Sequence, residues 1–169
     1  MAIERQRTER AAWEAPSTVP RVLVVQRDAA YAAVLTRRFQ AAGFQVVGCA
    51  GPHPPDYHCY VLTGTSPGGE PAPPGAEGRC PIVEIVDVLV YDPWLYATKG
   101  SSDASALIRA LRRRYPSQPI VLAWPEQGLP RLGDHLMLDP AVHVGPSDPD
   151  ALVEFVRGVC ADGLQAKRR

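Results

Sequence analysis

The sequence lacks three features that would place it in a broad class of binding or secreted proteins. Basic and acidic residues balance at 18 each, so no net charge attracts nucleic acid or an anionic membrane. No apolar run approaches the roughly 18 residues that a membrane span requires, and the charged start of the chain excludes an ordinary signal peptide. These absences predict a soluble, cytoplasmic protein that binds neither nucleic acid directly nor a membrane.

Motifs for nucleotide binding and hydrolysis are also missing. The glycine-rich stretch at 64–69 has neither a following Lys-Ser/Thr nor GxGxxG spacing, so it is not a phosphate-binding loop. Ser66 and Ser101 have no histidine at a recognisable nucleophile elbow. The arginines between residues 109 and 114 more often complement the carboxyl end of a helix than form a phosphate site. We therefore expect that the protein is not an enzyme.

Short apolar runs recur along the chain and have the composition of buried strands. The best defined covers residues 88–91 and ends abruptly at Asp92 and Pro93. Runs of this length bounded by turn residues are typical of strands buried on both faces of a parallel sheet. The expected strands are residues 21–25, 44–49, 87–91, 119–123 and 141–144.

Between most of these strands the apolar residues follow the 3.6-residue period of a helix. One helix starts at Asp28, a second after Ser102 or Asp103, and the last at Asp148 with Pro149 in its first position. Strands that alternate with helices predict an α/β fold. The expected architecture is a five-stranded parallel sheet flanked by helices, a flavodoxin-like three-layer sandwich.

A segment rich in proline and glycine interrupts this alternation. Residues 51–80 contain thirteen Pro and Gly residues, a density that a helix cannot cross. We expect a long, largely irregular insert before the third strand, where a crossover helix would otherwise stand. The chain then divides into a flexible N-terminal arm at 1–20, one domain at 21–160 that carries the insert, and a C-terminal tail at 161–169.

The layout of the expected domain resembles the receiver domain of two-component response regulators. The resemblance rests on the order of strands and helices, on the spacing from Gln26 to Gly43, on Asp92 at the end of the third strand, and on the Gly145-Pro146 step after the fifth. It covers the whole domain apart from the insert. It implies a CheY-like, receiver-like fold and a role in signal transduction within a two-component system.

The positions that hold a magnesium ion in receivers are degenerate in this chain. Receivers use an acidic pair after the first strand, because a hard divalent cation prefers carboxylate oxygens. The matching positions are Gln26 and Arg27, and an amide is a poor substitute while a guanidinium repels the metal. Asp28 lies one place further on, where a one-residue slip of the alignment would bring it into the site. The resemblance therefore implies that magnesium is not bound.

The other receiver positions are mostly lost as well. The phosphoacceptor matches Asp92, which is retained, whereas the switch hydroxyl matches Trp124 and the lysine matches Gly145, followed by a retained Pro146. Because phosphoryl transfer depends on positioning and charge neutralisation, these losses predict a pseudo-receiver without phosphotransfer. Two interpretations of Asp92 stay open: residual phosphorylation, or a structural carboxylate that hydrogen-bonds nearby loops or pairs with Arg27.

Cysteine and histidine residues in and beside the insert form a second candidate site. Thiolate and imidazole are the ligands that zinc prefers, and thiolates also hold iron–sulfur clusters. The spacing includes no Cys-x-x-Cys pair, and the alternative is that the cysteines are small packing residues. In a reducing compartment they are expected to be thiols or metal ligands before disulfides. The candidate ligands are Cys49, His53, His58, Cys59 and Cys80, whereas Cys160 is expected to pack inside the core.

Two classes of function follow from these patterns. The first is a stand-alone pseudo-receiver, a signalling or scaffold module that binds a protein partner or a second copy of itself through the last helix and the adjoining sheet edge. The sequence ends directly after that helix, so we expect output through a partner rather than a DNA-binding domain. The second is a metal-binding regulatory or redox-sensing protein whose insert carries the activity. A response regulator phosphorylated on Asp92 is a third hypothesis.

Overall fold

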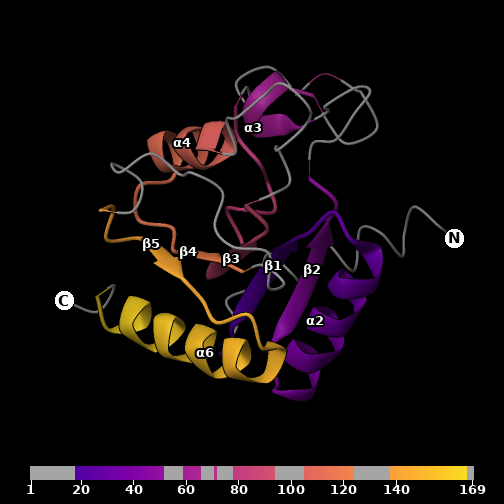
Figure 1. Cartoon of the computed structure of the whole chain (residues 1–169). Coiled ribbons are helices and arrows are strands. Elements are labelled where there is room, and N and C mark those ends of the chain that lie inside the picture. Colours follow the sequence, from indigo (N-terminus) through magenta and orange to yellow (C-terminus); the bar gives the residue numbers. More distant parts are fainter. Residues whose placement is uncertain are drawn as a thin grey trace, which may run out of the picture.

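A parallel five-stranded sheet forms the centre of the protein (Figure 1). The computed structural model describes residues 18–51, 59–65, 71, 78–93, 105–123 and 138–166. The spatial order of the strands is β2-β1-β3-β4-β5, and every neighbouring pair is parallel. This arrangement confirms the expected fold class. The strands are β1 (Arg21–Val25), β2 (Gln45–Cys49), β3 (Val88–Tyr91), β4 (Ile120–Leu122) and β5 (Val142–Val144).

Helices cover both faces of the sheet and complete a three-layer sandwich. Figure 1 shows α2 (Ala29–Ala41) and α6 (Pro149–Ala166) on one face. The opposite face carries α3 (Tyr60–Thr63) and α4 (Ser105–Arg114). Within the described ranges, no helix is long and apolar enough to cross a membrane.

The strands are apolar almost throughout because both faces of the sheet are buried. Successive side chains of a strand point to opposite faces, so each strand contributes to two separate clusters. In β1, Val22 and Val24 pack on the side of α2 and α6, whereas Leu23 and Val25 pack on the side of α4. The second cluster is called here the α4 cluster; its central members are Leu23, Val25, Leu89, Tyr91, Leu107, Ile108, Leu111, Ile120 and Leu122.

Aspartate side chains start α2 and α6, as the sequence predicts. Asp28 Oδ1 accepts hydrogen bonds of 2.8 and 3.0 Å from the amides two and three residues further on. Asp148 Oδ1 makes the same pair of contacts at 3.1 and 2.8 Å. Each carboxylate thereby satisfies backbone donors that a helix leaves open at its start.

Several expected boundaries differ from the structure. The last helix continues to Ala166, so much of the expected tail at 161–169 is helical. The insert contains α3, which the overall proline density did not predict. This helix forms in the longest stretch of the insert without proline, from 56 to 66. Gly64 ends α3 with a φ of 69°, a conformation that favours glycine. Residues 1–17 of the expected arm at 1–20 lie outside the described residues, as do residues 167–169 and the expected caps Ser102 and Asp103.

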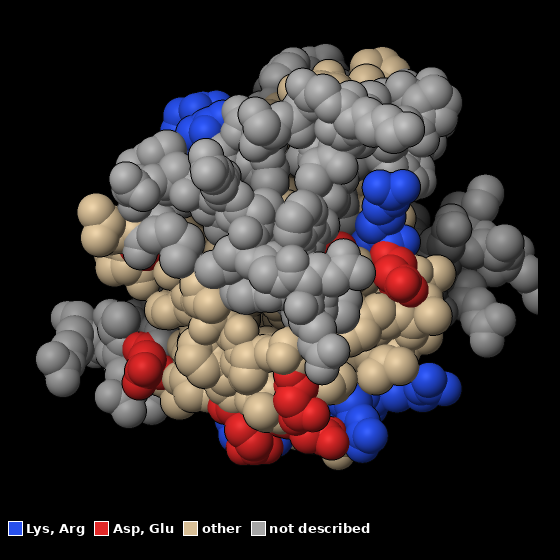
Figure 2. All heavy atoms as spheres, viewed as in Figure 1, with Lys and Arg blue, Asp and Glu red and all other residues tan. Residues whose placement is uncertain are grey.

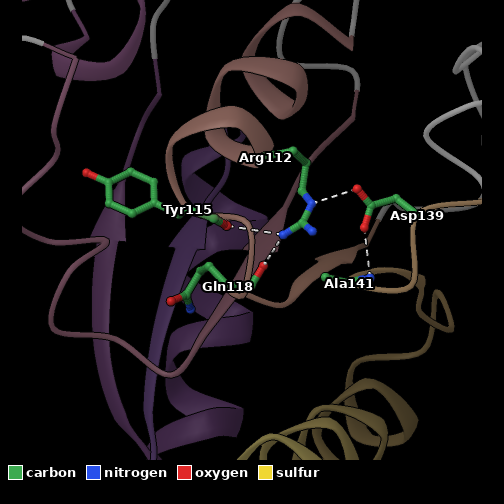
Figure 3. Close-up of polar contacts among 5 residues, drawn as sticks. All are labelled: Arg112, Tyr115, Gln118, Asp139 and Ala141. Carbon is green, nitrogen blue, oxygen red and sulfur yellow. Dashed lines mark hydrogen bonds and ion pairs between the residues drawn. The ribbon is translucent and has the colours of Figure 1, made fainter.

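Arg112 ties the carboxyl end of α4 to the segment before β5 (Figure 3). Its Nη1 donates to the backbone oxygens of Tyr115 and Gln118, both at 3.1 Å, and its Nε donates to Asp139 Oδ2 at 2.8 Å. Asp139 Oδ1 accepts in turn from the Ala141 amide at 2.9 Å. The Arg112 guanidinium holds the pKa of Asp139 below its usual value. This arginine therefore complements a helix end, as expected for the cluster.

Candidate functional site

The carboxyl ends of the parallel strands meet at one edge of the sheet, where open α/β folds place their sites. Asp92 directly follows β3 at this edge and is only 8% exposed. Its amide donates a 2.9 Å hydrogen bond to the backbone oxygen of Val25, the last residue of β1. The phosphoacceptor position is therefore held between β1 and β3, at the place that the sequence predicts.

The residues that match the magnesium ligands do not fit a magnesium ion. Gln26 is 4% exposed, and its Oε1 already accepts a 3.1 Å hydrogen bond from the Asp28 amide. Arg27 is exposed and brings a positive charge. The Asp28 carboxylate is exposed, and its Oδ1 accepts the hydrogen bonds that cap α2. These three side chains offer no pair of free carboxylate oxygens for a hard cation.

A pair between Arg27 and Asp92 is not formed either. None of the ion pairs between described residues joins the two side chains. The alternative in which Asp92 pairs with Arg27 therefore finds no support among the contacts of the described residues. Asp92 itself has further interactions within the fold, in keeping with its burial.

Tyr31 spans this edge from the first turn of α2. Its hydroxyl donates a long hydrogen bond of 3.4 Å to the backbone oxygen of Ser147, which lies between β5 and α6. Burial raises the pKa of Tyr31, and the negative charges of Asp92 and Asp148 raise it further. The hydroxyl thus lies within electrostatic range of the phosphoacceptor position. Sequence reasoning did not single out Tyr31 as a site residue, although its position three residues after the cap Asp28 places it in the first turn of the expected helix.

Gly145, which matches the receiver lysine, has no space for a side chain. A Cβ atom there would lie 2.7 Å from Leu152 Cδ1, 2.9 Å from Val121 Cγ1 and 3.3 Å from the backbone oxygen of Leu122. Leu152 and Val121 are fully buried. A side chain from α6 therefore fills the space in which the stem of a lysine would begin. Pro146, the retained proline, follows Gly145 and is half-buried.

Three of the predicted metal ligands pack on the same side of the sheet. Cys49 ends β2, Cys59 directly precedes α3, and Cys80 directly precedes a turn at 81–85. All three are partly buried and pack against the α4 cluster. Burial raises the pKa of each thiol. Cys160 is buried in the cluster on the other face of the sheet, which confirms its expected role in packing.

The structure does not assemble these cysteines into a metal centre. Within the described parts of the chain, no three Cys, His, Asp or Glu side chains are arranged to hold a metal ion. The candidate ligands His53 and His58 lie outside the described residues, as does Trp124 at the switch position.

Comparison with known proteins identifies the fold. No protein-family model matches the sequence, and no curated protein is similar to it at a significant level. Among solved structures, a CheY-like response regulator receiver domain from Methanospirillum hungatei JF-1 matches with a TM-score of 0.57 and 14% identity, over 88% of this chain and 99% of that one. The signal receiver domain of a putative LuxO repressor protein from Vibrio parahaemolyticus matches with a TM-score of 0.57 and 12% identity, over 88% of this chain and 95% of that one.

A third structure supports the same conclusion. The receiver domain of nitrogen regulatory protein C matches with a TM-score of 0.52 and 19% identity, over 85% of this chain and 95% of that one. At these identities the likeness concerns the fold alone. The protein therefore has a receiver-like fold, in agreement with the resemblance inferred from its sequence.

Proposed function

We propose that this protein is a pseudo-receiver, a cytoplasmic signalling module that acts through protein–protein interaction without phosphotransfer and without enzymatic activity of its own. The receiver-like fold supports a signalling role, because receivers transmit signals by binding other proteins. The degenerate site supports the loss of phosphotransfer. The two parts of the proposal are tested separately.

The observation that carries the loss of phosphotransfer is the packing around Gly145. Phosphoryl transfer requires cations that neutralise the charge developing on the phosphoryl oxygens. The side chains of Leu152 and Val121 exclude a lysine at Gly145, and the positions of Gln26 and Arg27 do not suit a metal ion. These positions thus supply neither the lysine nor the metal ion that phosphoryl transfer to Asp92 would need.

The kind of partner follows from the charge distribution. Figure 2 shows acidic and basic side chains of the described residues interspersed on the face in view, rather than gathered by sign. The whole chain carries 18 residues of each sign. Nucleic-acid binding depends on a basic patch that pairs with phosphates, and this pattern does not supply one on that face. A protein is therefore the proposed partner.

The proposed contact face combines β5 with the outer side of α6. Phe155 is 36% exposed, and the rings of His143 and Phe155 meet edge-on with centroids 6.4 Å apart. Aromatic residues are enriched at the centre of protein interfaces. We call His143 and Phe155 the α6 face.

A second copy of the chain is the proposed occupant of the α6 face. The exposed charges along α6 have both signs, with Asp150, Glu154 and Arg157 on the same helix. A surface that carries both signs can complement itself across a two-fold axis, which is how most homodimers form. The α6 face would supply the apolar centre of such a dimer and these charges its rim.

Sedimentation equilibrium of the purified protein tests this interface. The native protein should be a dimer, and Phe155→Glu should be monomeric while its circular dichroism spectrum is unchanged, because a charge in the centre of the interface is costly to desolvate. Val19→Glu, which changes a residue of similar exposure next to β1, is the matched control and should leave the dimer intact. A monomeric native protein, or a Phe155→Glu variant that dimerises equally well, would contradict the proposed dimer.

A metal-binding role of the insert is the second candidate. The observation in its favour is the convergence of Cys49, Cys59 and Cys80 on one cluster. Elemental analysis of protein prepared without a metal-affinity tag tests it: about one equivalent of zinc, or several of iron, per chain would support it. Cys59→Ser should then lose the metal. Folded protein without metal would leave the cysteines as packing residues.

A further inference from the structure

The two edge strands of the sheet differ in how well they are protected from further pairing. β2 and β5 stand at opposite ends of the row of strands, as the labels of Figure 1 show. β5 has three residues, with Pro140 and Pro146 close on either side. A short edge strand and nearby prolines are features by which proteins prevent another strand from pairing. β2 has five residues, and neither proline nor a charged residue occurs from Phe44 to Ala50. β2 is therefore the edge strand that can accept a further strand.

The outer side of β2 presents backbone donors and acceptors. The Gln45 amide and the Cys49 backbone oxygen form hydrogen bonds of 3.0 and 3.1 Å with the residues on either side of β1. In a parallel ladder, every second residue directs both its amide and its carbonyl to the same neighbouring strand. This alternation directs the amides and carbonyls of Val46 and Gly48 away from β1. Among the described strands, none pairs with this outer side, which we call the β2 edge.

Gly48 leaves the backbone of the β2 edge accessible. The residue is exposed, and an added Cβ atom would meet nothing within 4 Å. Glycine inside a strand has no side chain to pack, and it often marks a place where another backbone approaches closely. Val46 and Gly48 each offer one amide and one carbonyl to an extended chain laid along β2. Such a chain would join the sheet by main-chain hydrogen bonds, a known mode of peptide recognition.

The side chains of β2 indicate what such a segment should carry. Val46 packs at the margin of the cluster beside α2 and α6, whereas Val47 and Cys49 pack at the margin of the α4 cluster. All three are only half-buried, so apolar surface remains on both faces of the β2 edge. β2 has no charged side chain that could pair with a charge on the incoming segment. The segment that complements it is therefore uncharged and rich in β-branched apolar residues, which suit a strand with both faces buried.

Another protein suits the β2 edge better than a second copy of this chain, a step that rests on the proposed function. The proposed dimer already uses the α6 face, which includes His143 of β5, the strand at the far edge of the sheet. A closed dimer needs one two-fold interface, and a second self-complementary interface at β2 would join dimers into open chains. A segment of a different protein can occupy the β2 edge of each copy without such growth.

We propose that the β2 edge binds an extended, uncharged, β-branched segment of a partner protein, which adds to the sheet as a further parallel or antiparallel strand. The backbone groups of Val46 and Gly48 supply the hydrogen bonds, and the half-buried side chains on both faces of β2 supply the apolar contacts. The partner surface therefore lies at the opposite edge of the sheet from the α6 face. Binding at one edge leaves the other free.

Random heptapeptides displayed on phage are the probe for the β2 edge, with the full chain as the target. The selected peptides should carry uncharged β-branched residues at successive positions. A synthetic copy of a selected peptide should slow hydrogen exchange of the Val46 and Gly48 amides, measured by NMR, whereas the Val47 amide faces β1 and should change little. A copy that is N-methylated at the amides facing β2 should no longer bind, because it has lost its donors.

Two substitutions at Gly48 test the backbone contact from the side of the protein. Gly48→Pro removes an amide hydrogen that β1 does not use, and it should weaken binding of the selected peptide about fivefold or more, the effect of one lost hydrogen bond. Gly48→Ala keeps the amide, has space for its Cβ atom, and is the matched control that should bind as the native protein does. Both variants should stay dimers in sedimentation equilibrium, so the β2 edge and the proposed dimer are tested separately.

Three results would overturn the proposal. The first is a library that yields no peptide, or only peptides that bind Gly48→Pro as tightly as the native protein. The second is protection of amides away from Val46 and Gly48. The third is a Gly48→Pro variant that is folded but monomeric, since a second copy would then occupy the β2 edge. If circular dichroism shows that Gly48→Pro is unfolded, the N-methylated peptide decides on the native protein: unchanged binding of that peptide contradicts the proposal.

Discussion

Replacing Gly145 with alanine is the perturbation that probes the filled site most sharply. The added Cβ would lie 2.7 Å from Leu152 Cδ1 and 2.9 Å from Val121 Cγ1, distances that real Cβ contacts do not show. Both neighbours are fully buried, and Val121 is β-branched and therefore stiff. Neither side chain can move without disturbing the packing between α6 and the sheet.

The magnitude follows from two opposing effects. Overpacking of a buried site typically costs about 1 to 3 kcal/mol of folding free energy. Gly145 does not have a positive φ, so alanine can adopt its backbone conformation without strain. Alanine also restricts the unfolded chain more than glycine does, which stabilises the folded protein by about 0.4 to 1 kcal/mol. We expect Gly145→Ala to lower the free energy of unfolding by about 1 to 2 kcal/mol.

Urea unfolding followed by circular dichroism measures this change. Gly158→Ala, in the same helix as Leu152, is the matched control, because a Cβ there meets nothing within 4 Å. That variant should be more stable than the native protein by about 0.5 to 1 kcal/mol. Leu152→Ala alone should lower the free energy of unfolding. In the double variant with Gly145→Ala, the loss of stability should be about 1 kcal/mol smaller than the sum of the losses in the two single variants. A Gly145→Ala variant as stable as the native protein would refute the argument that Leu152 and Val121 fill this space.

Three further predictions concern the polar contacts. Arg112→Gln should lower the free energy of unfolding by about 1 to 3 kcal/mol, because it removes charged hydrogen bonds at a mostly buried site. Arg113→Gln, which changes an exposed arginine, is the control and should leave the free energy of unfolding nearly unchanged. Urea unfolding of both variants measures the difference. The pKa of the Asp139 carboxyl is lowered in the folded state, so its contribution to stability is present above the ordinary carboxylate pKa and is lost as the pH falls through the lowered value. Urea unfolding measured between about pH 5 and pH 2 should therefore show a steeper loss of stability in the native protein than in Arg112→Gln. Asp28→Ala should cost about 1 kcal/mol, because the amides at the start of α2 lose their acceptor, and an unchanged urea midpoint would contradict this.

The sequence predicted those parts of the fold that local chemistry decides. The apolar runs gave the five strands to within a residue or two, and Asp28 and Asp148 were recognisable as caps because a helix start has a short-range signature. The insert was harder, because proline density averaged over thirty residues concealed the proline-free stretch in which α3 forms.

The sequence predicted where the site residues lie along the sheet edge, but not which side chains they contact. Asp92 and Gly145 were located from the order of the strands, yet nothing local shows that Leu152, seven residues further on, fills the space at Gly145. The approach of Tyr31 to Asp92 and the hydrogen bond from the Cys80 amide to the Tyr115 hydroxyl also depend on how separate elements pack. Contacts of this kind arise from the tertiary structure, which apolar periodicity does not specify.

Reaction with a small-molecule phosphodonor tests the central claim most directly. The purified protein would be incubated with acetyl phosphate and magnesium, and its intact mass compared with that of Asp92→Asn and of a functional receiver treated in the same way. The account predicts that the functional receiver gains one phosphoryl group while this protein gains none, because the cations that phosphoryl transfer requires have no place at Gly145 or Gln26. A phosphoryl adduct on the native protein that is absent from Asp92→Asn would contradict the account and identify a working receiver.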